Sequence, residues 1–214
     1  MIVSQLCKTG KISLYYPLNK SKDNMINSSV SHSGTAIHFL IFALLVIWTA
    51  TPIRAQLTEN FEDGQKASYA GANVELSSGT WFFDDALLGK SNYDKFNGSQ
   101  GVRMDRRIVN GVRRTGSITM LFDKNDGADV VSFVSANYRS NTGNSLQLEY
   151  SIDKGGSWTS VGEPISLGSD LELFEVEVGV SGPIRFRWIQ SGDGRINLDD
   201  VAITDFIEAS DTQT

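Results

Sequence analysis

The stretch from Phe174 to Ile203 constrains the fold of this chain more than any other part of it. Apolar and charged residues alternate on each side of a turn-forming segment, Gly-Val-Ser-Gly-Pro at residues 179–183. A period of two places the apolar side chains on one face of a β-strand. We therefore predict an antiparallel ribbon whose register is selected by opposite charges. The expected partners are Val178 with Ile184, Glu177 with Arg185, and Glu175 with Arg187.

Short alternating runs continue along most of the chain after residue 56. The expected strands lie at residues 57–61, 74–76, 81–83, 102–104, 118–122, 130–134, 146–152, 158–161 and 196–203. Val130 to Val134 is apolar on both faces, which predicts a central strand, and Asn110-Gly111 predicts a type I′ hairpin turn. About ten short strands without a helical stretch indicate an all-β fold, an antiparallel jelly-roll β-sandwich.

Residues 1–55 have the features of a signal peptide with a long n-region. Phe39 to Ala50 is an apolar run that is short for a bilayer span but typical of a signal-peptide core. Ala55 occupies the expected cleavage position, although the true start is open between Met1 and Met25. We expect a secreted or cell-envelope protein without a membrane segment after cleavage, and an uncleaved membrane anchor is the alternative.

Residues 56–207 would then form the sandwich, and residues 208–214 a polar tail or the start of a linker. Cleavage would remove Cys7, the only cysteine, and both histidines, His32 and His38. This excludes a Ser-His-Asp triad, a Cys-His dyad and a His/Cys zinc site from the mature domain. Of 19 basic and 25 acidic residues, five basic and one acidic lie in the leader, leaving a net charge of −10. That charge argues against nucleic-acid binding by the isolated domain.

Carboxylates gather at the ends of the first and last expected strands. Glu62 and Asp63 follow the first strand, and Asp199-Asp200 lies within the last. If these strands are neighbours, the acids come together, and Ca²⁺ prefers about six to eight oxygen ligands. We predict a structural calcium site here, with one of the two adjacent aspartates facing the ion because strand neighbours point to opposite faces. The alternative is that all four are ordinary solvated acids.

One short motif predicts a particular turn. Ser151, Asp153, Gly155 and Trp158 match the Asp-box pattern S-x-D-x-G-x-x-W, in which serine and aspartate brace a hairpin. The motif resembles the hairpin turns of sialidase-type propellers, but a propeller needs several copies and a longer chain. We interpret this single copy as a structural brace.

Basic and aromatic residues supply two further candidates for a binding surface. Five arginines lie close together in sequence, at Arg103, Arg106, Arg107, Arg113 and Arg114. We interpret them as a hairpin paired with nearby carboxylates, with a polyanion-facing patch as the alternative. Trp81, Trp158 and Trp188 each continue an apolar alternation, so we expect core packing rather than sugar-stacking platforms.

Several sequence blocks together resemble a family of jelly-roll modules in secreted bacterial proteins. The blocks are FEDG at 61–64, Tyr69-Ala70, SSGTWFFDDALLG at 77–89, Asn97-Gly98 leading into GVRM at 101–104, ITMLFDKNDGA at 118–128, LEYSIDKGGSW at 148–158 and IRFRWIQSGDGRINLDDVAI at 184–203. Family members are similar to carbohydrate-binding and MAM-like sandwiches, and often sit beside DNA/RNA non-specific endonuclease or lamin-tail domains. The resemblance implies calcium bound by Glu62 and by Asp199 or Asp200, and no nuclease chemistry within this chain.

The function expected from these observations is that of a non-catalytic, exported accessory or binding module, stabilised by calcium. Its partner would be a glycan or a covalently linked catalytic domain. One alternative is the accessory domain of a secreted nuclease whose catalytic domain is absent from this chain; another is a carbohydrate-binding module. A carboxylate-only glycosidase using a pair such as Glu149 and Glu163 ranks last, because only their acidity marks them.

Overall fold

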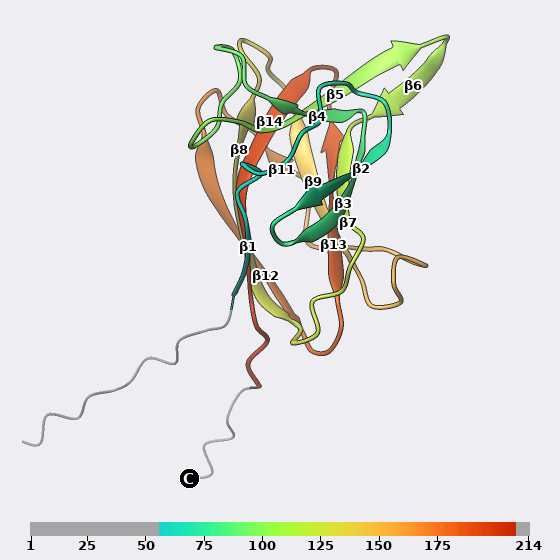
Figure 1. Ribbon diagram of the computed structural model, residues 1–214, viewed down its shortest axis with the longest axis vertical. Coiled ribbons are helices and arrows are strands. Elements are labelled where there is room, and N and C mark those ends of the chain that lie inside the picture. Colours follow the sequence, from blue (N-terminus) through green and yellow to red (C-terminus); the bar gives the residue numbers. More distant parts are fainter. Residues whose placement is uncertain (1–55, 209–214) are drawn as a thin grey trace, which may run out of the picture. The chain divides into compact units, whose positions relative to one another are not determined.

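The computed structural model describes residues 56–208, which fold into two seven-stranded antiparallel sheets packed face to face (Figure 1). Sheet A has the order β12 (Glu172–Val180), β8 (Ala128–Asn137), β14 (Arg195–Thr204), β5 (Gly101–Val109), β4 (Ala86–Gly89), with β1 (Gln56–Glu59) on β14 and β6 (Val112–Thr115) on β5. Sheet B has the order β10 (Thr159–Ser160), β9 (Ser145–Ser151), β13 (Arg185–Ser191), β7 (Ser117–Met120), β3 (Gly79–Asp84), β2 (Ala72–Leu76), with β11 (Ile165–Ser166) on β9. The predicted all-β sandwich is confirmed.

Two predictions about strand placement are also confirmed. The first and last strands are neighbours, since β1 pairs with β14 from Gln56 opposite Thr204 to Glu59 opposite Val201. Strand β8 lies between β12 and β14, in the interior position that its two apolar faces indicated. The pairing of β1 with β14 brings the acids that follow β1 close to those within β14.

The predicted ribbon of β12 and β13 is wrong, because the two strands belong to different sheets. Strand β12 pairs with β8, whereas β13 pairs with β7 and β9. The segment between them crosses from one sheet to the other, a distance of roughly 10 Å in a sandwich. Both strands turn their apolar residues toward the same core, but from opposite sides of it, so the alternation alone did not reveal the crossing.

The charges of β13 find other partners. Arg185 binds Asp123 at 2.6 Å, and Arg187 binds Glu149 on β9 at 2.5 Å. Glu175 and Glu177 remain exposed on β12. Opposite charges therefore do pair across neighbouring segments, but the partners of the two arginines are Asp123 and Glu149 and not the glutamates of β12.

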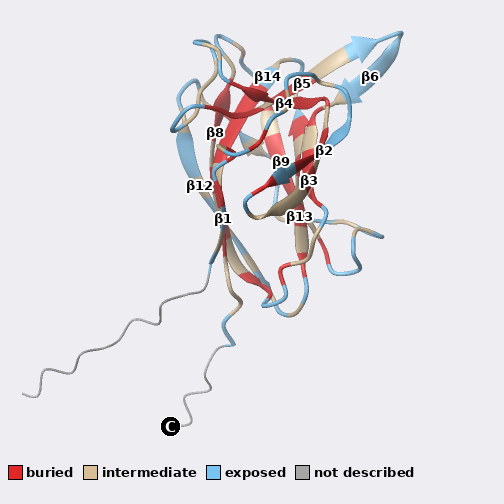
Figure 2. Ribbon diagram, viewed as in Figure 1, coloured by how far each residue is buried: buried red, intermediate tan, exposed pale blue. Residues whose placement is uncertain are grey.

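Large aromatic side chains fill the space between the sheets. Trp81 and Trp188 are fully buried with ring centroids 5.7 Å apart, and Phe61 packs edge-on against Trp81 at 5.7 Å. Buried residues follow the strands of both sheets (red in Figure 2). The core placement predicted for these two tryptophans is confirmed. Trp158 differs, since it is only partly buried and lies against the Arg187 guanidinium, 4.3 Å from the ring centre.

The hairpin of β5 and β6 projects from the sandwich (Figure 1). Its turn residues, Asn110 and Gly111, both have positive φ, at 51° and 76°. That is the backbone of a type I′ turn, as the Asn-Gly pair predicted. The exposed tip carries Ile108 and Val112.

The predicted signal peptide at 1–55 and most of the tail at 208–214 lie outside the described residues, and both stay predictions. Within residues 56–208, nothing helical is long and apolar enough to cross a bilayer.

A pair of tryptophan variants tests the core. Replacing Trp188 with alanine should lower the free energy of unfolding by about 3–5 kcal/mol, because it removes one of the two largest fully buried side chains of the core. Trp158→Ala should cost about 1 kcal/mol, the worth of its stacking on Arg187. Urea denaturation followed by circular dichroism measures both, and Trp188→Phe provides a milder change if the alanine variant fails to fold. Equal costs at the two positions would contradict this account of the core.

Candidate functional site

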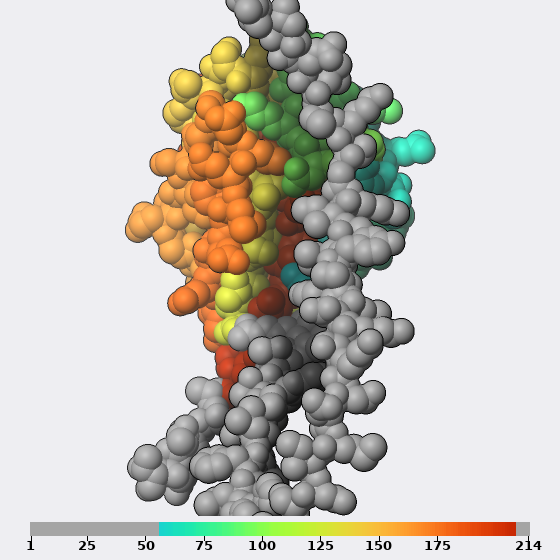
Figure 3. Space-filling model, turned by 90° about the vertical axis from the view of Figure 1, so that its left-hand side faces the viewer, coloured from blue at the N-terminus to red at the C-terminus, as the bar shows by residue number. Residues whose placement is uncertain are grey.

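Three of the four predicted calcium ligands lie around one loop on the outer side of sheet A. The loop, residues 90–100, lies against β14 (green against red in Figure 3). Asp199 accepts a hydrogen bond from the Asn97 amide at 2.9 Å, and Asp200 accepts one from the Asn97 side chain at 2.5 Å. Glu62 accepts from the Ser99 amide at 2.9 Å and from its hydroxyl. The acids from the two ends of the domain therefore bind the same short segment, residues 97–99.

The expectation that Asp199 and Asp200 point to opposite faces is wrong. The pairing of β14 with β8 shifts register between Asp199 and Ala202, and Asp200 has a positive φ of 48°. Such a bulge interrupts the alternation of side chains. As a result, both carboxylates reach Asn97 rather than only one.

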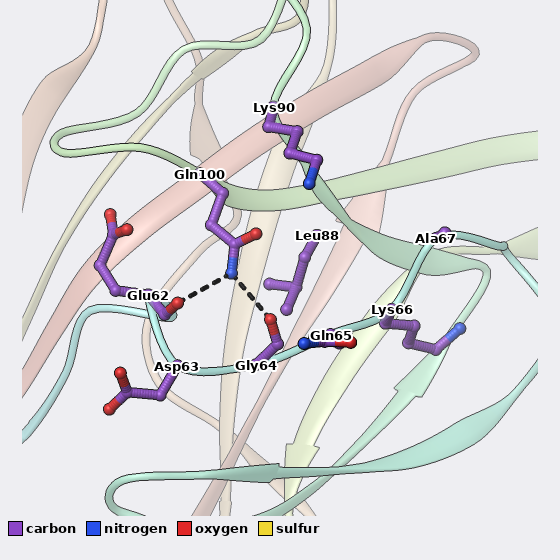
Figure 4. A pocket seen from close by; sticks show the side chains of 9 residues that line it. All are labelled: Glu62, Asp63, Gly64, Gln65, Lys66, Ala67, Leu88, Lys90 and Gln100. Atoms are coloured by element: carbon purple, nitrogen blue, oxygen red, sulfur yellow. Dashed lines mark hydrogen bonds between the residues drawn. The ribbon is translucent and has the colours of Figure 1, made fainter.

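Asp63 does not join this group. It is exposed, and its carboxylate diverges from that of Glu62 (Figure 4). Both residues line a polar pocket with Lys66, Lys90, Gln100 and others, which has a volume of about 620 Å³. The Gln100 amide points at the backbone of residues 61–64 and donates to the Phe61, Glu62 and Gly64 carbonyls at 2.7, 3.2 and 2.9 Å.

The electrostatics of the group are unusual for surface acids. Asp199 is fully buried, and burial, together with the neighbouring Asp200 and Glu62 carboxylates, raises its pKa to about 7. Hydrogen bonds from Ser99 lower the pKa of Glu62. A buried carboxyl beside two like charges is stabilised either by a proton or by a cation.

The donor set fits Ca²⁺ in chemistry, since all three side chains offer carboxylate oxygens, which this hard cation prefers. Within residues 56–208, no cluster of three or more His, Cys, Asp or Glu side chains meets the geometry of a metal site. The carboxylates instead bind N–H and O–H groups of residues 97–99. Calcium binding at Glu62, Asp199 and Asp200 stays a prediction.

Four of the five arginines on β5 and β6 are paired with carboxylates, and Arg106 donates to the Gly192 carbonyl at 3.0 Å, which supports the interpretation preferred from the sequence. Arg107 and Arg114 both bind Asp85, at 2.9 and 2.6 Å, and Asp85 is buried with a positive φ of 43°. Arg113 pairs with Asp193. These ion pairs anchor the hairpin to the sandwich.

The Asp-box motif forms the braced turn that was predicted. Asp153 accepts hydrogen bonds from the Ser151 hydroxyl at 2.6 Å and from the Ser157 amide at 2.8 Å, which lowers its pKa. The glycosidase pair receives no support, because Glu149 binds Arg187 and Glu163 is exposed in the turn between β10 and β11.

A surface that sequence reasoning missed lies on the same side of sheet A. Three of the four tyrosines in residues 56–208 contact an arginine there. We name it the Tyr–Arg cluster: Tyr69, Tyr93, Tyr138, Arg103, Arg107, Arg139 and Arg195. The tyrosines come from three loops, and three of the arginines come from β5 and β14.

Cation–π contacts connect the Tyr–Arg cluster. Arg107 lies 4.8 Å from the Tyr69 ring centre, and Arg103 lies 5.1 Å from that of Tyr138. Arg195 also faces Tyr138, at 5.8 Å. The sequence contained a weak signal for this surface, because the three tyrosines occur in polar loops. An aromatic residue in such a loop is not needed for core packing, so it is a candidate for binding.

Comparison with known proteins identifies the fold. No protein-family model and no curated protein sequence matches the chain. The CBM22-1 xylan-binding domain of Xyn10C from Paenibacillus barcinonensis is similar in structure, with a TM-score of 0.50 and 10% identity over 72% of this chain and 97% of that domain. The K2 cleaved adhesin domain of Lys-gingipain has a TM-score of 0.53 and 16% identity over 70% and 99%. The likeness is one of fold, and the association with nuclease or lamin-tail domains stays a prediction.

The buried acid gives a pH-dependent prediction. A folded pKa of about 7 against the usual 3.8 means that the folded state keeps a proton that the unfolded state releases. In chelator, the free energy of unfolding should therefore fall as the pH rises from 4 to 7, by up to about 4 kcal/mol from this group. Chemical denaturation across this range measures the slope. Asp199→Asn should lose most of it, and an unchanged slope would show that Asp199 does not titrate as described.

Proposed function

We propose that residues 56–208 form a non-catalytic, exported sugar-binding module, with the Tyr–Arg cluster as its binding surface and calcium as its stabilising ion. The observation that carries the proposal is the convergence of three loop tyrosines and four arginines on one outer sheet face. Loops held by a rigid sandwich are the usual place for binding residues.

The chemistry of the Tyr–Arg cluster suits a sugar. Tyrosine offers an apolar ring and a polar hydroxyl, so it can contact the C–H face of a pyranose and also hydrogen-bond to it. Guanidinium groups donate several hydrogen bonds in a fixed plane, which matches the many oxygens of a saccharide. The fold shared with a xylan-binding domain supports the proposal without setting the ligand.

Two observations favour binding over catalysis. The part of the chain after residue 55 has neither cysteine nor histidine. The acids beneath the Tyr–Arg cluster are engaged in ion pairs, Asp94 with Arg103 at 3.2 Å, Asp105 with Arg195 at 3.4 Å and Asp85 with Arg107 at 2.9 Å. None of them is poised as a free general acid or base.

Calcium would act on stability rather than on sugar chemistry. Glu62, Asp199 and Asp200 would hold it beside residues 97–99, where an ion would offset the repulsion between neighbouring carboxylates. The same loop carries Tyr93 and Asp94, so a bound ion would also stiffen one edge of the Tyr–Arg cluster.

Sugar binding is tested with the protein purified after expression of the full-length chain. Soluble xylan, mannan and pectic polysaccharides in native affinity gels are the probes. Tyr69→Ala and Tyr138→Ala should each weaken retardation about tenfold, because a stacked aromatic ring contributes roughly 1–2 kcal/mol. Trp158→Ala on sheet B is the matched control and should bind as the wild type does. Retardation that Trp158→Ala abolishes, and the tyrosine variants do not, would move the site to sheet B.

Calcium binding is tested by thermal melting. The melting temperature should rise with added calcium, and occupancy at 100 times the dissociation constant adds about 2.7 kcal/mol of stability. Glu62→Gln should blunt the response, while Asp63→Asn should keep it, because only Glu62 faces the loop. A melting temperature that chelator and millimolar calcium leave unchanged would rule out a stabilising ion.

A further inference from the structure

Charge in the Tyr–Arg cluster is layered. The aspartates lie beneath, with the Asp94 side chain 0% exposed and that of Asp105 7% exposed. The guanidinium groups lie above them, with Arg107 39% and Arg195 45% exposed. The surface offered to solvent is therefore cationic, even though each acid lies within ion-pair distance of an arginine.

This surface stands out against the rest of the chain. Its four arginines lie over three buried aspartates, Asp85, Asp94 and Asp105, in a chain whose residues 56–214 carry a net charge of −10. A local positive region in an acidic protein attracts a small or sparsely charged anion while the whole molecule repels a dense polyanion.

The arginines are also oriented before any ligand arrives. Arg195 is held by Asp105 from below and by the Tyr138 ring, and Arg139 lies 4.5 Å from the Tyr93 ring centre. Arg139 has a positive φ of 52°, an uncommon backbone for a non-glycine residue, of the kind that gathers at binding sites. Stacked, paired guanidinium groups lose little freedom on binding and match planar anions such as carboxylates.

One tyrosine hydroxyl adds a donor to the same surface. The Tyr69 phenol, like that of any tyrosine, is protonated near neutral pH and can donate a hydrogen bond, and burial raises its pKa further. The Arg103 Nε is buried without a hydrogen-bond partner, so the network around this arginine is incomplete.

As an extension that rests on the sugar-binding function proposed above, we infer that the Tyr–Arg cluster selects anionic saccharides, whose carboxylate or sulfate groups bind Arg139 and Arg195. Nucleic acid is the less suitable polyanion. Its affinity comes from neutralising many phosphates in a row, whereas this surface offers a few guanidinium groups, most already paired with aspartates.

Matched probes test the inference on the protein expressed from the full-length chain. Tetragalacturonate and its methyl ester share one skeleton and differ in whether the carboxyl groups are charged or esterified. Dextran sulfate and dextran also share one skeleton and give the sulfate arm. Isothermal titration at fixed pH and calcium should show the acid binding about tenfold tighter than the ester, with a preference that shrinks between about 50 and 200 mM NaCl. A preference restricted to one arm identifies carboxylate or sulfate as the group recognised.

Two arginine variants locate the preference. Arg195→Gln and Arg139→Gln should each reduce the acid-over-ester ratio to about threefold or less. Arg139 lies on the exposed surface, so its variant keeps the test valid if loss of Arg195 disturbs Asp105. Arg113→Gln, on the β5–β6 hairpin, is the control and should leave the ratio unchanged.

Each remaining outcome counts against the inference in a distinct way. Equal binding of acid and ester would overturn it while leaving the sugar-binding function intact. A total absence of saccharide binding would remove both. Binding of single-stranded oligo(dT) that Arg195→Gln abolishes would identify nucleic acid as the ligand instead.

Discussion

The carboxylate of Asp94 connects the loop at residues 90–100 to strands β5 and β14, which together carry much of the Tyr–Arg cluster. It is fully buried and accepts hydrogen bonds from the Ser91 amide at 2.9 Å, the Arg103 guanidinium at 3.2 Å and the Asn197 side chain at 3.1 Å. It thereby fastens the outer loop to β5 and β14. Gly89 completes the fit, because a Cβ there would meet the Asp94 carboxylate at 2.5 Å. Together with the hydrogen bonds that Lys95 and Asn97 donate to β14, this anchor positions the loop that carries Tyr93 on the sheet.

The sequence predicted the structure correctly where a short motif is compatible with a single local conformation. The Asn110-Gly111 pair specifies its turn through backbone φ alone, and the Asp-box specifies its own hydrogen bonds. The apolar run of β8 predicted an interior strand because burial on both faces leaves few other positions. The placement of Glu62 and the acids of β14 around one loop followed from pairing of the first and last strands, a property of the whole sandwich.

The sequence was misleading where several partners satisfy the same pattern. Period-two alternation says which face of β12 and β13 is apolar, but both sides of a sandwich core accept that face. Opposite charges did not identify the partner strand either, since Arg187 pairs with Glu149 on β9 and not with Glu175, the partner predicted from the sequence. The residue types around Asp200 do not indicate a bulge. The Tyr–Arg cluster could not be predicted either, because it is formed by three loops that only the tertiary structure brings together.

Strand β14 runs from one end of the sandwich to the other, so its length gives the distance between them. Arg195, in the Tyr–Arg cluster, begins the strand, and Thr204, beside Gln56, ends it. At about 3.3 Å per residue, roughly 30 Å separate them. The chain enters and leaves the domain at one pole, while the cationic aromatic surface lies near the other. A domain attached to a larger body through either of these ends would therefore present this surface on the side away from the attachment.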